Sequence, residues 1–302
     1  MIGKLFIFIK SPNPKGVERV KMPNLKIESL TSNSLSHYRT RHYFERVGEI
    51  NSVDDLQEYC NWAKENKVKI YIIGNGSNTL FVQKNIQSLI LKNKLPKYTN
   101  PLANNRLEVS SSASVMEVLK YCYQNSMNSF YYLASVPATI GGALAMNAGR
   151  GRQHGSTIYD FVESVTFFED GCIKTLENSQ IVRDYRETMF TGIHSKLILS
   201  AIFKFKPTEF TENPLISRQN WAKEHQDNTA PNCGSVFKAA NYAILEKLKG
   251  LSIGKAMFSA KTSNWILAKS QSSYSIIILI KIAKILHFIT RQKIALELIL
   301  ID

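Results

Sequence analysis

The chain has 302 residues, of which 44% are hydrophobic and 21% are charged, and no long polar or repetitive tract interrupts it. These proportions predict a globular protein with two or three packed units and exclude a largely disordered chain. The formal net charge of +14 favours anionic partners. Because the basic residues form no dense run and no aromatic recognition motif accompanies them, we expect a phosphorylated small molecule and no nucleic acid.

Cysteine spacing and hydropathy narrow the class of protein further. The cysteines are widely separated along the chain, at Cys60, Cys122, Cys172 and Cys233. Without a C-x-x-C pair they indicate free thiols in a reducing compartment, and we expect no metal site. The most apolar stretch, residues 276–289, contains Lys281 and Lys284 and is shorter than the ~20 apolar residues that a spanning helix needs. We therefore expect a cytoplasmic protein without membrane insertion.

Helices and strands alternate along most of the predicted chain. Residues 1–34, which contain Pro12, Pro14 and Pro23, are expected to be a loosely ordered lead-in. Ser52 can cap the helix that follows it, and Asp54 and Asp55 suit the first turn of that helix. The further predicted elements are strands at 69–73, 89–91 and 107–109, a helix at 114–123, strands at 162–168 and 196–205 joined by a hairpin-like turn at 169–171, a linker at 207–214, further helices and a last strand at 294–301. Residues 276–289 read as an amphipathic helix that covers a sheet, with Ile276, Ile280, Ile282 and Ile285 near one face.

Two glycine-containing segments have the composition of a ligand-binding backbone. Residues 74–78, GNGSN, follow a predicted buried strand, and consecutive backbone N–H groups of such a turn can converge on phosphate oxygens. Taken alone, such a segment is a structural loop more often than a ligand site. Residues 135–149 form a small-residue run with a Gly-Gly pair, which lets backbone lie flat against a flavin or a pyrophosphate.

Four motifs in order, GNGSN, SVPATIGGALAMNAG, DYRETMF and CGSVFK, resemble those of the UDP-N-acetylenolpyruvoylglucosamine reductases (MurB). The resemblance spans residues 35–302. It implies an α+β fold in which a two-part FAD-binding domain of the vanillyl-alcohol-oxidase type precedes a smaller C-terminal substrate-binding domain. The corresponding boundaries are 35–95 and 96–208 for the two FAD-binding parts and 215–302 for the substrate domain.

The resemblance also implies an activity and its cofactors. Members of the family reduce the enolpyruvyl ether of UDP-N-acetylglucosamine, with FAD as the cofactor and NADPH as co-substrate, in the synthesis of peptidoglycan precursors. The flavin carries the hydride, and the protein positions it. The short connection over residues 147–158 resembles the second type of the family, which holds FAD non-covalently. The implied FAD-binding residues are Gly74, Asn75, Gly76, Ser77, Asn78, Ser135, Val136, Pro137, Thr139, Gly141, Gly142 and Asn147.

By the same resemblance, Arg186 and Ser235 are the catalytic residues. Arg186 would face the substrate carboxylate, for which a guanidinium fork is suited, and Ser235 would donate the final proton. Tyr185, Arg186 and Lys238 are the implied substrate-binding residues. The connection also carries three basic residues, which either form a solvated loop or contact an anionic ligand: Arg150, Arg152 and His154.

Departures from the family pattern concentrate at the substrate end. The family ends in a strand that reads LEPEVR, but here Ile299 stands where the second glutamate belongs, and Glu297 matches only the first. Residues 239–240 are alanines in place of an Asn-Pro pair, and Ala138 replaces a glycine. Three functions therefore stay open: a cell-wall reductase, a paralogous enzyme for another nucleotide-sugar or sugar acid, or a flavin-binding protein without turnover. We expect a monomer, and the choice between NADPH and NADH is open.

Overall fold

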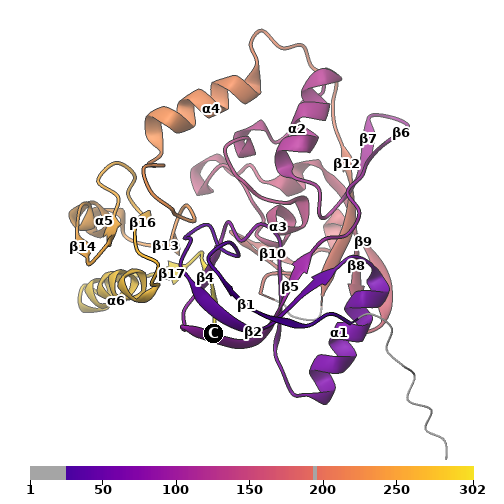
Figure 1. Cartoon of the computed structure of the whole chain (residues 1–302). Coiled ribbons are helices and arrows are strands. Elements are labelled where there is room, and N and C mark those ends of the chain that lie inside the picture. Colours follow the sequence, from indigo (N-terminus) through magenta and orange to yellow (C-terminus); the bar gives the residue numbers. More distant parts are fainter. Residues whose placement is uncertain (1–24, 193–195) are drawn as a thin grey trace, which may run out of the picture.

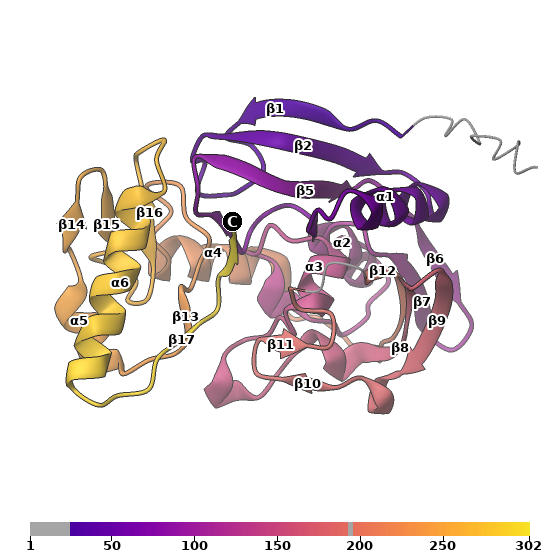
Figure 2. The ribbon, with the colours of Figure 1, turned by 90° about the horizontal axis from the view of Figure 1, so that it is seen from below.

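The computed structural model describes residues 25–192 and 196–302. Two larger sheets lie side by side, and the C-terminal elements gather at one end of the molecule (Figures 1 and 2). Helices and strands are mixed along the chain, so the α+β fold predicted from the sequence is confirmed. In the described part of the chain, no helix is long and apolar enough to cross a membrane.

The first sheet has the order β1-β2-β5-β3, with β1 antiparallel to β2 and the other neighbours parallel. Its strands are β1 (Glu28–Ser32), β2 (His42–Ile50), β3 (Ile70–Ile73) and β5 (Asn85–Asn93). Helix α1 (Val53–Glu65) connects β2 to β3 and packs Leu56 on this sheet. As predicted, Ser52 caps α1, because its hydroxyl accepts a hydrogen bond from the Asp55 backbone N–H at 3.0 Å.

The expected lead-in needs a correction, because part of it is regular structure. Strand β1 lies within residues 1–34 and pairs with β2 in an antiparallel register. The sequence signal was weak because four of its five residues are exposed, so no apolar alternation marks the strand. The three prolines that motivated the prediction lie outside the described residues.

The second sheet is antiparallel, in the order β6-β7-β12-β8-β9. Its strands are β6 (Thr99–Leu102), β7 (Arg106–Ser110), β8 (Val162–Glu169), β9 (Cys172–Glu177) and β12 (Leu197–Lys204). The turn at 169–171 joins β8 to β9 and not to β12, which corrects the predicted connection. Strand β9 escaped prediction because it is an edge strand with almost all of its residues exposed.

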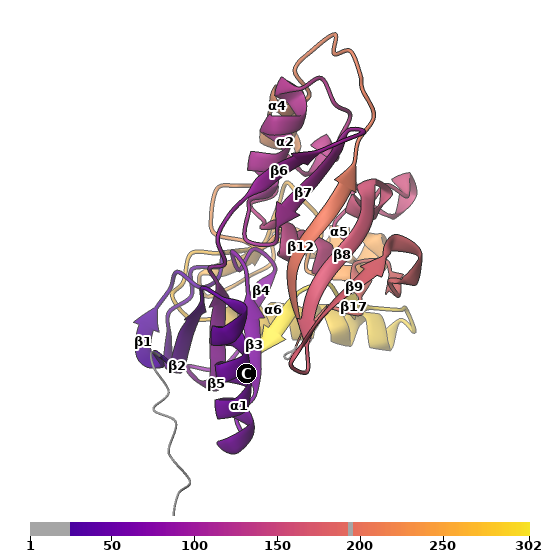
Figure 3. The same ribbon diagram turned by 90° about the vertical axis from the view of Figure 1, so that its right-hand side faces the viewer.

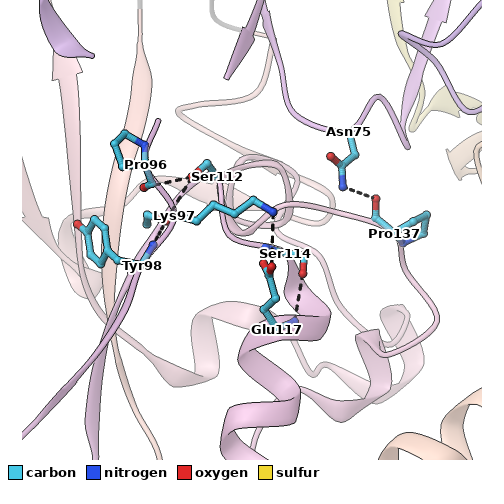
Figure 4. Close-up of polar contacts among 9 residues, drawn as sticks. Asn75, Pro96, Lys97, Tyr98, Ser112, Ser114, Glu117 and Pro137 are labelled. Atoms are coloured by element: carbon cyan, nitrogen blue, oxygen red, sulfur yellow. Dashed lines mark hydrogen bonds and ion pairs between the residues drawn. The ribbon is translucent and has the colours of Figure 1, made fainter. Parts of the chain in front are cut away.

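Helices and short elements cover this second sheet. They are α2 (Val115–Gln124), α3 (Ile140–Ala145), four 3₁₀ turns (Tyr131–Leu133, Arg152–His154, Ile158–Phe161, Asn178–Gln180) and the hairpin β10 (Arg183–Asp184) and β11 (Glu187–Thr188). Helix α2 begins at Ser114 with a capping box to Glu117, which Figure 4 shows. Helix α3 lies inside the segment 135–149, where the sequence indicated only a loop.

The C-terminal elements form a unit whose apolar core also takes in Tyr38 and Leu80; its first helix is an exception, because Leu215 of that helix belongs to the core of the second sheet. The elements are α4 (Pro214–His225), β13 (Phe237–Ala239), α5 (Tyr242–Leu248), β14 (Ser252–Ile253), β15 (Ala256–Phe258), β16 (Ile266–Ala268), α6 (Tyr274–Ile289), β17 (Ala295–Leu296) and β18 (Ile299–Ile301). As predicted, α6 covers a sheet, formed by β14, β15 and β16 (Figure 2). Ile276 and Ile280 face this core, but Ile285 is 55% exposed and does not share the buried face.

The chain end returns to the first half of the molecule. Strand β18 pairs in parallel with β4 (Thr79–Phe81), close to β3 in Figure 3. The strand predicted at 294–301 is therefore two short strands, because β17 pairs instead with β13 and the chain changes partners at Glu297 and Leu298. This change of partners places Glu297 between the C-terminal unit and the loop that precedes β4.

Candidate active site

A cavity of about 510 Å³ is lined by residues from three parts of the fold: the first sheet, the second sheet with its helices, and the C-terminal unit. One wall is the backbone of residues 74–78 and of the small-residue run around α3, and the opposite wall comes from the C-terminal unit. Its volume is in the range of small-molecule and cofactor sites. The predicted site residues that line it are Gly74, Asn75, Gly76, Ser77, Asn78, Val136, Thr139, Gly141, Gly142, Arg186 and Ser235.

The segment 74–78 connects β3 to β4 and adopts a conformation that only glycine tolerates at its centre. Gly76 has a φ of +67°, and a Cβ atom there would overlap the carbonyl oxygen of Leu35. The side-chain amide of Asn75 donates a hydrogen bond of 3.1 Å to the carbonyl oxygen of Pro137, as Figure 4 shows. This contact fastens the first glycine segment to the second.

The second segment approaches the first through small residues. A Cβ atom at Gly74 would lie only 2.5 Å from Oγ1 of Thr139, so the two segments touch. Thr139 also caps α3, because its hydroxyl accepts a hydrogen bond of 3.2 Å from the Gly142 backbone N–H. Outside its chain neighbours and its own helix backbone, a Cβ atom at Gly142 would have one close neighbour among the described residues, that hydroxyl at 3.3 Å. The wall at Gly142 therefore leaves room for a ligand to approach the backbone.

Five predicted site residues do not line the cavity: Ser135, Pro137, Asn147, Tyr185 and Lys238. Asn147 donates a hydrogen bond of 2.9 Å from its side chain to the carbonyl oxygen of Asp184, so it fastens the β10–β11 hairpin to the small-residue run. Lys238 forms an ion pair with Glu187. Tyr185 contacts the guanidinium groups of two arginines, at 4.4 Å from Arg152 and 5.1 Å from Arg186. These residues support the cavity from outside its lining.

Arg186 lies at the turn between β10 and β11 and is held by the protein itself. Its terminal nitrogens donate hydrogen bonds to the carbonyl oxygens of Asn147 at 3.2 Å and Gly149 at 2.7 Å. Its Nε lies 3.1 Å from Oε1 of Glu297, in an ion pair whose side chains are only 13% and 17% exposed. The guanidinium is thus held in place and largely buried, while its Nε makes no hydrogen bond within the described residues and each terminal nitrogen keeps a second N–H, so donors remain for a ligand carboxylate.

Glu297 is an acidic residue of the cavity that was not among the site residues implied by the family resemblance. Its side chain lines the cavity and is buried beside Arg186. Burial raises the pKa of Glu297 to about 7, and the nearby charges of Arg186 and Lys238 only partly oppose this. Ile299, the first residue of β18, lines the same cavity. Because the chain changes strand partners at Glu297, this carboxyl reaches the cavity without a shift of β18 along β4.

Ser235 follows Gly234, whose φ is +73°, and lines the cavity half-buried. Of the three basic residues in the short connection, only Arg150 lines the cavity, while Arg152 packs on Tyr185 and His154 is exposed. Sequence reasoning also missed one face of α4, which lines the cavity through Arg218, Trp221 and His225. The 3-and-4 spacing of these residues was the available signal, but such spacing is typical of any helix face.

Comparisons with known proteins agree with this architecture. A family model described as an FAD binding domain matches residues 45–176. The UDP-N-acetylenolpyruvoylglucosamine reductase of Bacillus pumilus is 30% identical over 71% of this chain and 73% of its own, and that of Aquifex aeolicus is 29% identical over 79% and 83%. The crystal structure of the Thermus caldophilus reductase has the same fold, with a TM-score of 0.71 at 17% identity, over 92% of this chain and 99% of that one. On these similarities, the chain belongs to the family of UDP-N-acetylenolpyruvoylglucosamine reductases.

Proposed function

We propose that the protein is an FAD-dependent reductase that reduces the enolpyruvyl ether of UDP-N-acetylglucosamine, with NADPH as co-substrate. The observation that carries this proposal is the composition of the cavity. Its lining combines glycine-rich backbone with three reactive side chains: Arg186 from the β10–β11 hairpin, and Ser235 and Glu297 from the C-terminal unit. The backbone suits a cofactor, and the side chains supply a fixed cation, a hydroxyl and a carboxyl for a reaction in which charge develops. We further expect a monomer in the cytoplasm.

The cavity fits FAD on features of the chain itself. The glycine segments meet through the side chains of Asn75 and Thr139, and Gly142 leaves space on the cavity side. The hydroxyl of Tyr132 is buried at the cavity and has no hydrogen-bond partner within the described residues, so it is free to bond a ligand. Residues 74–78 and 139–142 would hold the cofactor through their backbone. When bound, FAD supplies hydride transfer from NADPH to the substrate.

The three reactive side chains of the lining would manage the substrate's charge and its proton. Arg186, held by the carbonyl oxygens of Asn147 and Gly149, presents a fixed positive charge toward a substrate carboxylate. Ser235 places a hydroxyl in the cavity that can pass a proton to substrate carbon. Glu297, whose pKa is raised to about 7, can hold a proton at neutral pH and so replenish it.

One observation favours a second candidate, a paralogous enzyme for another nucleotide-sugar. Ile299 lines the cavity where the family places a carboxylate, so the wall beside Glu297 is apolar. A substrate with a less charged reacting group would tolerate this wall better than one that becomes an enolate. A loss of turnover, with flavin binding retained, would be the extreme result of the same change.

Purification and rapid kinetics test the proposal. The protein should be yellow, and NADPH should bleach the flavin absorbance in a stopped-flow instrument. Addition of the enolpyruvyl ether of UDP-N-acetylglucosamine under anaerobic conditions should restore the colour, and NADH in a parallel arm measures the nicotinamide preference. Bleaching without restoration would refute the proposed substrate and favour the paralogous enzyme, whereas colourless protein would refute the flavin assignment.

A further inference from the structure

One face of α4 forms a stacked array on the cavity wall. Arg218, Trp221 and His225 follow one another at helical spacing and all line the cavity. The guanidinium carbon of Arg218 lies 4.1 Å from the Trp221 ring centroid, and the rings of Trp221 and His225 are stacked with centroids 4.6 Å apart at 7°. His225 is fixed in turn, because its Nδ1 lies 2.9 Å from the carbonyl oxygen of Trp221. The array is therefore held together by contacts among its own residues.

A second arginine lines the same cavity. Arg150, from the short connection after α3, is close enough to Arg218 to repel it, and both line the cavity. Burial, and then this repulsion, lower the pKa of Arg218, although the guanidinium of an arginine stays charged at neutral pH. No carboxylate pairs with either arginine within residues 25–192 and 196–302.

The donors of Arg218 also lack protein partners. Its Nε is buried and makes no hydrogen bond to any residue that the structure describes. A buried donor without a partner is unfavourable, and two neighbouring cations add to that cost, so this corner of the cavity suits an anion. A guanidinium stacked on an indole ring keeps its in-plane N–H groups free, and these match the oxygens of a phosphate. Trp221 is 44% exposed, which leaves the array accessible from the cavity.

We propose that Arg218 and Arg150 bind the diphosphate of a nucleotide ligand, with Trp221 and His225 as positioning residues that hold Arg218. The inference rests on the proposed function only for the identity of that nucleotide. Two sources share this chemistry, the sugar nucleotide and the nicotinamide dinucleotide, and both carry a diphosphate. FAD also carries one; Arg150 lies within the span 45–176 that matches the FAD binding domain and Arg218 lies outside it, so the flavin content of the variants decides whether the cofactor is the ligand.

The direct test uses uridine diphosphate as the probe and calorimetric titration of the flavin-loaded protein. Arg218→Ala and Arg150→Ala should each weaken binding roughly 10- to 100-fold, the typical loss for a charge-assisted hydrogen bond. Lys223→Ala is the matched control, because Lys223 is an exposed residue of the same helix that lies outside the cavity lining. This control removes the same charge and should change the affinity less than about twofold. If Arg218→Ala and Lys223→Ala weaken uridine diphosphate binding equally, the effect comes from net charge alone, and the proposal is overturned.

The positioning role of Trp221 has its own readout. Trp221→Leu should weaken uridine diphosphate binding, and Trp221→Phe should recover most of it, because an aromatic ring can still support the guanidinium. Arg218→Lys should not recover it, since an ammonium lacks the planar fork. Identical affinities of the Leu and Phe variants would remove Trp221 from the site.

The two half-reactions distinguish the sugar nucleotide from the nicotinamide dinucleotide, and the flavin content of the variant tests whether FAD is the ligand. If the sugar nucleotide is bound, Arg218→Ala should raise the substrate concentration needed for half-maximal flavin re-oxidation and leave bleaching by NADPH unchanged; a change in both steps would mean that both nucleotides use the site. Loss of flavin from Arg218→Ala would assign the arginine to the cofactor and overturn the proposal. Uridine diphosphate binding that depends on Arg218, in a protein that does not turn over the enolpyruvyl sugar, would sustain this inference while refuting the proposed function.

Discussion

The buried carboxyl of Glu297 should make the stability of the protein depend on pH in a way that Glu297→Gln removes. Its pKa is about 7 in the folded protein against 4.5 for an ordinary glutamate, because burial penalises the charged form. The folded state therefore binds this proton more tightly than the unfolded state. The resulting stabilisation is fully present below pH 4.5 and is lost as pH rises through 7.

The size of this stabilisation follows from the difference between the two pKa values of Glu297. At about 1.4 kcal/mol per pKa unit, the shift corresponds to roughly 3 kcal/mol between pH 4.5 and pH 7. Glutamine cannot titrate, so the free energy of unfolding of Glu297→Gln minus that of the parent protein should increase by about this amount over the window. Loss of the Arg186 ion pair also changes the free energy of unfolding of the variant. The quantity to compare is therefore the change of the difference with pH, and not the absolute difference.

Urea denaturation of both proteins from pH 4.5 to pH 8, at a fixed excess of FAD, provides the assay. Glu212→Gln, a substitution of an exposed glutamate, controls for the removal of one acidic group. Parallel stability profiles for Glu297→Gln and its parent would contradict the argument, since they would mean that the carboxyl titrates alike in the folded and unfolded states.

Three further substitutions test the site. Gly142→Leu should yield colourless protein, because its side chain would enter the space beside the glycine wall; retention of stoichiometric FAD would refute this placement. Ser235→Ala should leave flavin reduction unchanged and slow re-oxidation by substrate ~10²–10⁴-fold, whereas equal slowing of both steps would make Ser235 structural. Ile299→Glu should cost ~1–3 kcal/mol in urea denaturation without a gain in re-oxidation rate, because Arg186 is already paired with Glu297; a clear rate gain on the enolpyruvyl sugar would contradict this.

The sequence predicted the elements whose residues carry a local signal. Ser52 marked a helix start because capping chemistry lies within one helical turn, and apolar spacing indicated the helix at 114–123. The edge strands β1 and β9 were missed because exposed strands show no apolar alternation. The glycine segments were found by composition, but their contact through Asn75 and Pro137 joins residues 62 positions apart, which no local pattern can reveal.

The position of Glu297 shows why a motif alignment can misplace a functional group. The family motif places its carboxylate at residue 299, and residues two apart on a strand are separated by ~6.6 Å, so on a continuous strand the carboxyl of Glu297 would lie away from that position. That distance assumes one continuous strand. Here the chain leaves β17, and hydrogen bonds hold the Glu297 backbone from both sides: its N–H donates to Val236 at 2.8 Å, and its carbonyl oxygen accepts from the Asn78 side chain at 2.9 Å. A carboxyl anchored at such a crossing can serve the cavity from an offset position, and its pairing with Arg186 means that the acid and the cation of this site would be tuned together.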